Sequence, residues 1–112
     1  MTYSPYRQHN VDYLNEPTYV YVLMNPDTKD AFYIGISVSP WGRFEQHYRD
    51  PCSAAYRIMR MLFDGRNLFH RDEILKIYKR CATRQEALDL EYRLVTTTPN
   101  LLNRPYRRGR SY

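Results

Sequence analysis

Two short tyrosine-bearing segments, joined by a turn, constrain the fold of this chain more than any other feature. Residues 18–24 and 32–36 are rich in β-branched and aromatic side chains, as strands are. The six residues between Met24 and Ala31 read Asn-Pro-Asp-Thr-Lys-Asp, and each of these types is common in turns. The pattern predicts a β-hairpin.

Side chains alternate along a strand, so the hairpin should have two different faces. The residues expected on the core face are apolar: Val20, Val22, Met24, Phe32, Ile34 and Ile36. The opposite face should carry Tyr19, Tyr21, Tyr33 and Gly35. Two tyrosines beside the gap left by Gly35, with Arg43 eight residues further along the chain, form a candidate phosphate site.

The rest of the chain predicts three helices and one more strand. A first helix should begin at Ser39 and Pro40 and run to about Tyr48. A second should be capped by Ser53. Its apolar face would carry Ala54, Ala55, Ile58, Met59 and Leu62, and Asp64-Gly65 would end it. Residues 69–78 should hold the third strand, with 73–78 as its centre. Thr83 and Glu86 predict a capping box for a last helix that runs to about Thr97.

This order, strand, strand, helix, helix, strand, helix, predicts an α+β fold in which helices flank a small three-stranded antiparallel sheet. With 112 residues the chain suits one domain. We expect an N-terminal arm over residues 1–17, a folded domain over 18–103 and a basic C-terminal tail over 104–112.

Glu91 interrupts the apolar stripe of the last predicted helix. Its neighbours three and four residues away are all apolar: Ala87, Leu88, Leu94 and Val95. A carboxylate in a buried stripe is costly unless it is paired or binds a metal ion. A salt bridge to a buried arginine is one explanation, and a metal site is the other. Magnesium suits a site with one carboxylate, completed by waters and phosphate oxygens.

Arg43 and His47 are four residues apart on the first predicted helix and share a face. Arginine presents a planar fork of donors that fits phosphate oxygens. His47 could orient a water molecule, accept its proton or hold a phosphate. The alternative for both residues is an ordinary solvated helix face.

Together these residues resemble the GIY-YIG nuclease family. Tyr19-Val20-Tyr21 stands where the family has Gly-Ile-Tyr, and Tyr33-Ile34-Gly35 matches the second motif. Arg43, Glu91 and Asn103 match the family's helix arginine, its metal-binding glutamate and its closing asparagine, so the resemblance runs from about Thr18 to Asn103.

The resemblance implies a metal-dependent endonuclease that hydrolyses phosphodiester bonds, with Mg²⁺ or Mn²⁺ as cofactor. The catalytic residues would be Tyr21, Tyr33, Arg43, His47 and Glu91, with Glu91 as the metal ligand, and Gly35 and Asn103 would be structural. We expect a tyrosine, rather than His47, to be the general base, because a nearby Arg43 and a metal ion favour a phenolate. His47 lies one turn beyond Arg43, and we expect it to be too far along the helix to reach the same water.

The chain is basic, with a formal net charge of +5 and a pI of about 9.3. This favours an acidic partner, and we expect nucleic acid, DNA rather than RNA, with nicking as the outcome. The tail arginines Arg104, Arg107, Arg108 and Arg110 could contact its backbone, or could belong to a solubilising tail. Two isolated cysteines, no apolar run long enough for a membrane span and no signal-peptide core suggest a cytoplasmic protein.

Two other function classes remain compatible with the sequence. One is a nucleic-acid-binding module that has the same fold and little or no cleavage. The other is a protein-interaction domain, for which the basic surface would be incidental. Magnesium-dependent cleavage of a plasmid separates the nuclease from both.

Overall fold

A three-stranded antiparallel sheet forms the middle layer of the protein, as the sequence predicts. The structure is a computed structural model, and it describes residues 16–64 and 70–103. The strands are β1 (Thr18–Met24), β2 (Ala31–Ser37) and β3 (Leu75–Cys81), in the spatial order β2-β1-β3. The helices are α2 (Pro40–Arg49), α3 (Tyr56–Asp64), α4 (Arg71–Ile74) and α5 (Arg84–Thr97). Strand β1 is therefore central, and it pairs antiparallel with both neighbours.

The turn between β1 and β2 is closed by Asn25. Its backbone N–H donates to Asp30 O at 2.9 Å, and its carbonyl accepts from Lys29 N at 2.8 Å. The Asn25 side-chain oxygen also accepts from Asp27 N at 2.8 Å, which is the turn-forming bond typical of asparagine. Lys29 takes a left-handed φ of 67°. These bonds fix the register of the hairpin, in which Tyr21 lies opposite Gly35.

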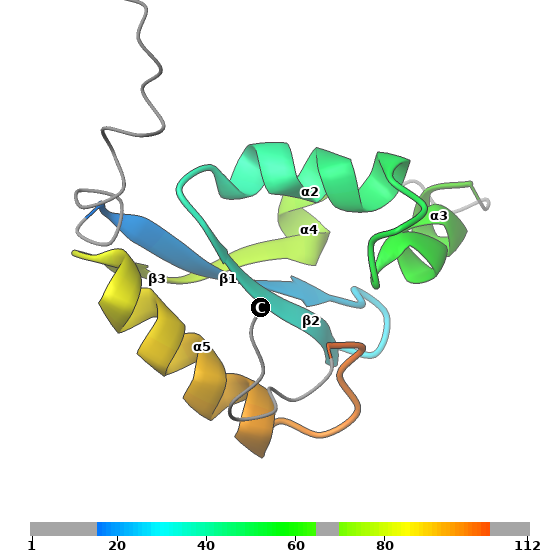
Figure 1. Ribbon diagram of the computed structural model, residues 1–112. Helices are drawn as coiled ribbons and strands as arrows, with labels where there is room; N and C mark the ends of the chain where they lie inside the picture. The colour runs from blue at the N-terminus through cyan, green and yellow to red at the C-terminus, as the bar shows by residue number, and fades with distance from the viewer. Residues whose placement is uncertain (1–15, 65–69, 104–112) are drawn as a thin grey trace, which may run out of the picture.

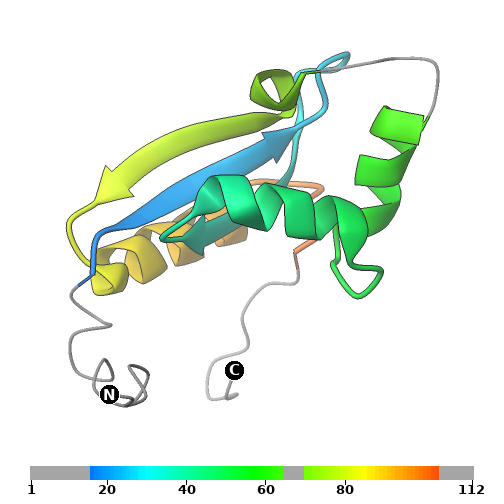
Figure 2. The ribbon, with the colours of Figure 1, turned by 90° about the horizontal axis from the view of Figure 1, so that it is seen from above.

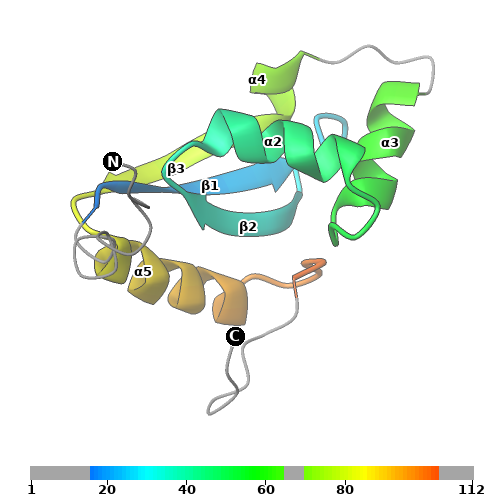
Figure 3. The ribbon, with the colours of Figure 1, turned by 45° about the horizontal axis from the view of Figure 1, so that its top comes forward.

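Helices cover both faces of the sheet (Figures 1 and 3). Helix α5 packs against one face, where Val20 and Ile34 join Ala87 and Val95 in a buried cluster. Helix α2 lies along the other face, and α3 follows it toward one end of the sheet (Figure 2). A second buried cluster there contains Tyr21, Leu23, Phe44, Ala55, Met59 and Ile74. The tyrosine face is thus a second core face, because α2 and α3 bury most of it.

Phe32 is on the opposite face from the one predicted. It joins the cluster of Tyr21 instead of lying with Ile34. The register explains this, because Met24 pairs with Ala31 and Leu23 pairs with Tyr33, which leaves Phe32 as an extra residue. An extra residue of this kind is a β-bulge, and a bulge redirects the side chain at that position.

The third strand begins later than predicted. Strand β3 starts at Leu75, and Glu73 and Ile74 belong to the short helix α4, which was not expected from the sequence. His70 and Glu73 explain the helical turn: Glu73 N donates to His70 O at 2.9 Å, and His70 N donates to Glu73 Oε1 at 3.2 Å. Such reciprocal bonds start a helix.

The predicted boundaries of α2 and α5 are confirmed. Of their two predicted N-terminal caps, one forms and the other does not. Thr83 Oγ1 accepts from Glu86 N at 3.1 Å, as predicted. The Ser39 side chain makes no capping bond. Helix α3 begins at Tyr56 rather than at Ser53, and Ala54, predicted on its apolar face, is exposed. Among the described residues, no helix is both long and apolar enough to cross a membrane.

Candidate active site

Gly35 leaves the space in which the Tyr21 ring lies. The two residues face each other across β1 and β2. A Cβ atom added at Gly35 would lie 2.6 Å from Tyr21 Oη and 2.7 Å from Tyr21 Cζ, closer than such atoms can approach. The phenol therefore crosses directly over the glycine, and any side chain at position 35 would push it away.

The Tyr21 hydroxyl begins a buried chain of hydrogen bonds. It lies 2.8 Å from His47 Nε2. His47 Nδ1 in turn lies 2.5 Å from Ser53 Oγ, and Ala55 N donates to the same oxygen at 3.1 Å. His47 and Tyr21 are both buried. The Tyr33 ring completes the group, since its centroid lies 4.5 Å from that of His47 in an edge-to-face arrangement.

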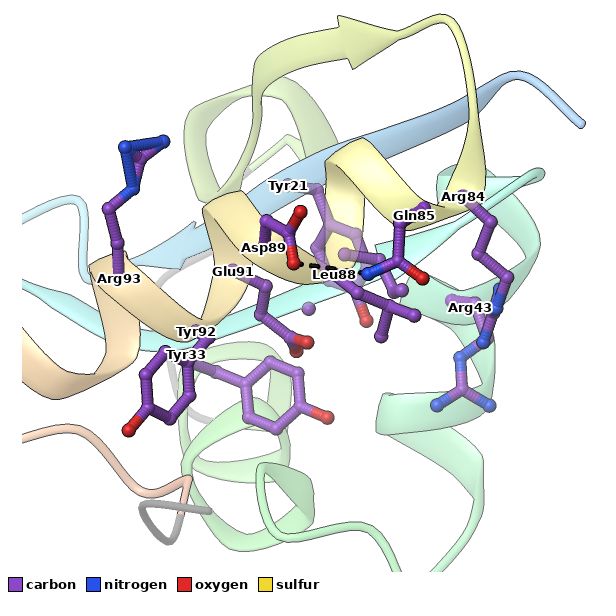
Figure 4. Close-up of a pocket in the computed structure, with 12 residues that line it drawn as sticks. Tyr21, Tyr33, Arg43, Arg84, Gln85, Leu88, Asp89, Glu91, Tyr92 and Arg93 are labelled. Carbon is purple, nitrogen blue, oxygen red and sulfur yellow. Dashed lines mark hydrogen bonds between the residues drawn. The ribbon is translucent and has the colours of Figure 1, made fainter. Parts of the chain in front are cut away.

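These tyrosines line an open cleft of about 1060 Å³ between the sheet, α2 and α5. Figure 4 shows Glu91 reaching toward the tyrosine rings from α5, with Arg43 on α2 and Arg84 on α5 among the other residues that line the cleft. The cleft is lined by Tyr21, Tyr33, Gly35, Ile36, Arg43, Arg84, Gln85, Leu88, Asp89, Glu91, Tyr92 and Arg93. Its polar lining contains three tyrosines, three arginines and two acidic residues, of which Glu91 is buried.

Glu91 is 6 % exposed, as expected from its place in the apolar stripe. Ala87 and Val95, four residues before and after it, pack in the cluster between α5 and the sheet. The stripe therefore holds α5 against the sheet, and Glu91 lies at its margin where the cleft opens. The negative charge of Glu91 is close enough to raise the pKa values of Tyr21 and Tyr33.

Burial has the largest effect on the pKa values of Tyr21 and Tyr33. It raises the pKa of Tyr21 far above the usual 10 and raises the pKa of Tyr33 as well, and the positive charge of Arg43 offsets only part of each shift. Arg43 favours the phenolate, as expected, but the burial of both phenols outweighs its effect. Burial and the charge of Arg43 also lower the pKa of His47 to about 4. His47 is therefore neutral at neutral pH, and one of its ring nitrogens can accept a proton.

The sequence of the chain was compared with models of known protein families, and a match covers most of it. Residues 17–105 match the model of the GIY-YIG catalytic domain. This chain belongs to the GIY-YIG family. Searches of curated proteins and of solved structures gave no significant match. Membership in the GIY-YIG family implies nuclease activity in general and a nucleic acid as substrate.

GIY-YIG nucleases are generally dependent on a divalent metal ion. Among the described residues, no group of three or more His, Cys, Asp or Glu side chains could hold a metal ion. Mg²⁺ does not need such a group, because it keeps several waters and binds through one or two carboxylates together with substrate phosphates. The buried Glu91 carboxylate at the margin of the cleft fits this mode of binding.

The structure brings together all five side chains predicted to be catalytic. Tyr21, Tyr33, Arg43 and Glu91 line one cleft. His47 lies behind Tyr21 and in contact with it. From the sequence we expected His47 to lie too far along α2 to reach the same water. Its contact with Tyr21 could not be foreseen, because the contact depends on how α2 crosses the sheet.

Asn103 hydrogen-bonds the end of the domain to strand β2, as expected. Its Oδ1 accepts from Ile34 N at 2.9 Å, and its Nδ2 donates to Ile34 O at 2.6 Å. Leu102 N adds a bond to Phe32 O at 2.8 Å. The end of the domain is therefore fastened along the free edge of β2. The tail arginines Arg104, Arg107, Arg108 and Arg110 lie outside the described residues.

Sequence reasoning missed two residues of this region. Ser53 was interpreted only as a helix cap, and no local signal connects it to His47. The position of Arg84 could have been recognised from the sequence. It precedes Glu91 by seven residues, which is about two helical turns, so the two residues share a face of the helix. That spacing places an arginine and the buried glutamate along one side of α5, and both line the cleft.

Proposed function

We propose that this protein is a metal-dependent endonuclease that nicks DNA in the cleft between α2 and α5. The observation that carries the proposal is that Tyr21, Arg43 and Glu91, from three separate elements, line one cleft. A binding module would need a positive surface, but it would have no need of a buried carboxylate beside a tyrosine and a neutral histidine. Hydrolysis has a use for each of these groups: a proton acceptor, a positive charge on the phosphate and a ligand for a metal ion.

Tyr21 and His47 would act as one proton acceptor. The Tyr21 phenol is too deeply buried to lose its proton to solvent at neutral pH, since burial raises its pKa. It lies 2.8 Å from a histidine whose low pKa keeps it neutral. As Tyr21 Oη takes a proton from the attacking water, its own proton passes to His47 Nε2. A new P–O bond forms and the P–O ester bond on the opposite side breaks. The leaving oxygen takes up a proton from solvent, and no covalent enzyme intermediate is needed.

Ser53 would set the tautomer that this transfer requires. For His47 Nε2 to accept a proton, Nδ1 must carry the other one and donate it. Ser53 Oγ lies 2.5 Å from Nδ1, and it already accepts a bond from Ala55 N. A hydroxyl oxygen can accept two hydrogen bonds. Ser53 is therefore a positioning residue rather than a catalytic one.

Arg43 and Glu91 would handle the charge on the phosphate. Arg43 would bind the phosphate oxygens and stabilise the negative charge that develops on them. Glu91 would hold the divalent ion, which when bound supplies positive charge for the leaving oxygen. Burial of Glu91 would fix the carboxylate in one position, so that it would hold a bound ion at one place in the cleft.

A plasmid assay at several pH values tests the proposal and the choice of base together. Supercoiled plasmid should pass through the open circle, and it should do so only with Mg²⁺ or Mn²⁺. Tyr21→Phe and His47→Ala should each lose on the order of a hundredfold in single-turnover rate. Ser53→Ala should lose less and should change the pH profile of the rate. No metal-dependent cleavage of DNA or RNA would contradict the nuclease. Full activity of Tyr21→Phe with loss in Tyr33→Phe would move the base to Tyr33.

A further inference from the structure

A tryptophan beside the cleft is unused by the chemistry proposed above. Trp41 lies in the first turn of α2, two residues before Arg43, and 39 % of it is exposed. Its ring meets that of Tyr19 edge-to-face, with centroids 5.5 Å apart and an interplanar angle of 73°. In this arrangement Tyr19 contacts at most one face of the indole. The pair is held from β1 and α2 together, so it is a fixed support rather than a loose side chain.

Two arginines lie toward this pair at the end of the sheet where β1 begins and β3 ends. Arg80 on β3 lies directly opposite Tyr19 on β1, and both side chains point to the same face of an antiparallel pair. Arg80 is exposed. Arg84, at the start of α5, follows β3 closely and lines the cleft. Figure 1 shows the starts of α2 and α5 at the same end of the molecule as the start of β1 and the end of β3.

The pair also continues directly into the candidate active site. Tyr19 precedes Tyr21 by two residues on the same strand and the same face, about 7 Å away. Trp41 precedes Arg43 in the same helix. Exposed Val38, in the link between β2 and α2, adds apolar surface beside them. Bases stack on aromatic rings, and arginines bind the phosphate backbone. An exposed aromatic pair with arginines nearby, next to a phosphate site, can therefore bind a single nucleotide.

We propose that Trp41, supported by Tyr19, stacks against one unpaired base next to the phosphate that is cut. The proposal rests on the nuclease function and specifies its substrate: DNA with at least one unpaired nucleotide, such as a bulge, a flap or a single strand. In an uninterrupted duplex both faces of every base are already stacked, so such a substrate cannot use the platform. Trp41 therefore selects for substrate shape and not for sequence.

The single tryptophan gives a direct readout of this contact. Trp41 is the only tryptophan of the chain, so its fluorescence reports on this platform alone. The full chain should be titrated in EDTA, which prevents cleavage, with a DNA duplex that carries one unpaired base. We expect strong quenching by this DNA. A fully paired duplex, and a duplex with an abasic site at the unpaired position, should bind with little quenching. Equal quenching by all three DNAs, or none by any of them while they bind, would overturn the proposal and leave the nuclease intact.

Variants provide an independent measurement by fluorescence anisotropy of labelled DNA. Trp41→Ala should weaken binding to the unpaired-base DNA about tenfold and change binding to the paired duplex little, while Trp41→Phe should recover most of the loss. Met61→Ala is the matched control, because Met61 is an exposed apolar residue on α3 outside the cleft. Equal losses on both DNAs would overturn the proposal. If no nucleic acid binds at all, the nuclease function fails together with it.

Acrylamide quenching of the free protein tests whether another protein segment already covers the Trp41 ring. If the platform is free for DNA, acrylamide should quench Trp41 readily before any DNA is added. Protection in the free protein would show that another segment of this chain, or a second copy, covers the indole. Dilution separates these two outcomes, and either one overturns the proposal.

Discussion

Tyr21 takes part in two interactions that depend on each other. Its ring needs the empty space over Gly35, and its hydroxyl needs His47. A change at Gly35 therefore affects the hydrogen-bond chain through the position of the ring. The two motif residues act together because the tyrosine and the glycine lie opposite each other in the sheet.

Gly35→Ala should destabilise the fold by about 1–3 kcal/mol, because the new methyl group meets the Tyr21 ring within a packed core. Chemical denaturation of the single variants and of the double variant measures this. In a Tyr21→Leu background, which lacks the clashing phenol atoms, the cost of Gly35→Ala should be clearly smaller. An equal cost in both backgrounds would contradict the contact.

The stability of the protein should fall in mild acid because of His47. Its pKa is about 4 in the folded protein, against about 6.5 in an unfolded chain. Between these values the unfolded chain binds a proton that the folded protein does not bind. Its contribution to stability is therefore complete above pH 6.5 and is lost as the pH falls toward 4. Between pH 7.5 and 5, wild type should lose roughly 1–2 kcal/mol more of its unfolding free energy than His47→Gln. Equal losses would show that His47 titrates normally.

At the scale of elements, the free edge of β2 is closed by the end of the domain. Asn103 acts as a one-residue strand partner, since it both donates to and accepts from the backbone of Ile34. An open edge would leave these polar groups to water and would expose the strand to pairing with other chains. This contact also sets the distance between β2, which carries Tyr33, and the end of α5.

Asn103→Ala should lower the unfolding free energy by roughly 1–3 kcal/mol, because it leaves Ile34 N and O without their partner. Hydrogen exchange should show faster exchange at the Ile34 amide. Asn103→Asp retains the acceptor for that amide and should protect it better than alanine does. Unchanged exchange at Ile34 in the alanine variant would show that the tie contributes nothing to the edge.

The sequence predicted elements well where one local pattern decides them, and less well where two elements meet. The hairpin, the bounds of α2 and α5 and the burial of Glu91 follow from turn chemistry, caps and a helical stripe. The bulge at Phe32 depends on pairing register, which no local pattern specifies. The later start of β3 follows from the short helix that His70 and Glu73 begin, and the strand-like residues 73–78 conceal that helix in the sequence. The link from Ser53 through His47 to Tyr21 could not be predicted, because it joins a loop, a helix and a strand that meet only in the fold.

At the scale of the whole molecule, a net charge of +5 should attract the DNA backbone to this protein. The basic tail contributes four arginines that lie outside the described residues: Arg104, Arg107, Arg108 and Arg110. Removal of residues 104–112 should weaken binding to all DNA sequences alike. The slope of log affinity against log salt should become shallower by roughly 0.9 for each phosphate that the tail neutralises in the full-length protein. A tail of equal length in which serines replace the arginines should behave like the truncation. An unchanged slope would show that the tail does not bind the backbone.

Glu91 is the residue on which the proposed metal-dependent nuclease activity depends most. Glu91→Gln keeps the size of the side chain and removes its charge, and Glu45→Gln is the matched control on the exposed surface of α2. The most direct test is single-turnover nicking of supercoiled plasmid with limiting Mg²⁺, alongside DNA binding in EDTA. Wild type and Glu45→Gln should produce open circles at the same rate. Glu91→Gln should bind DNA as wild type does and should nick it on the order of a hundredfold more slowly, or not at all. Nicking by Glu91→Gln at the wild-type rate would contradict the claim.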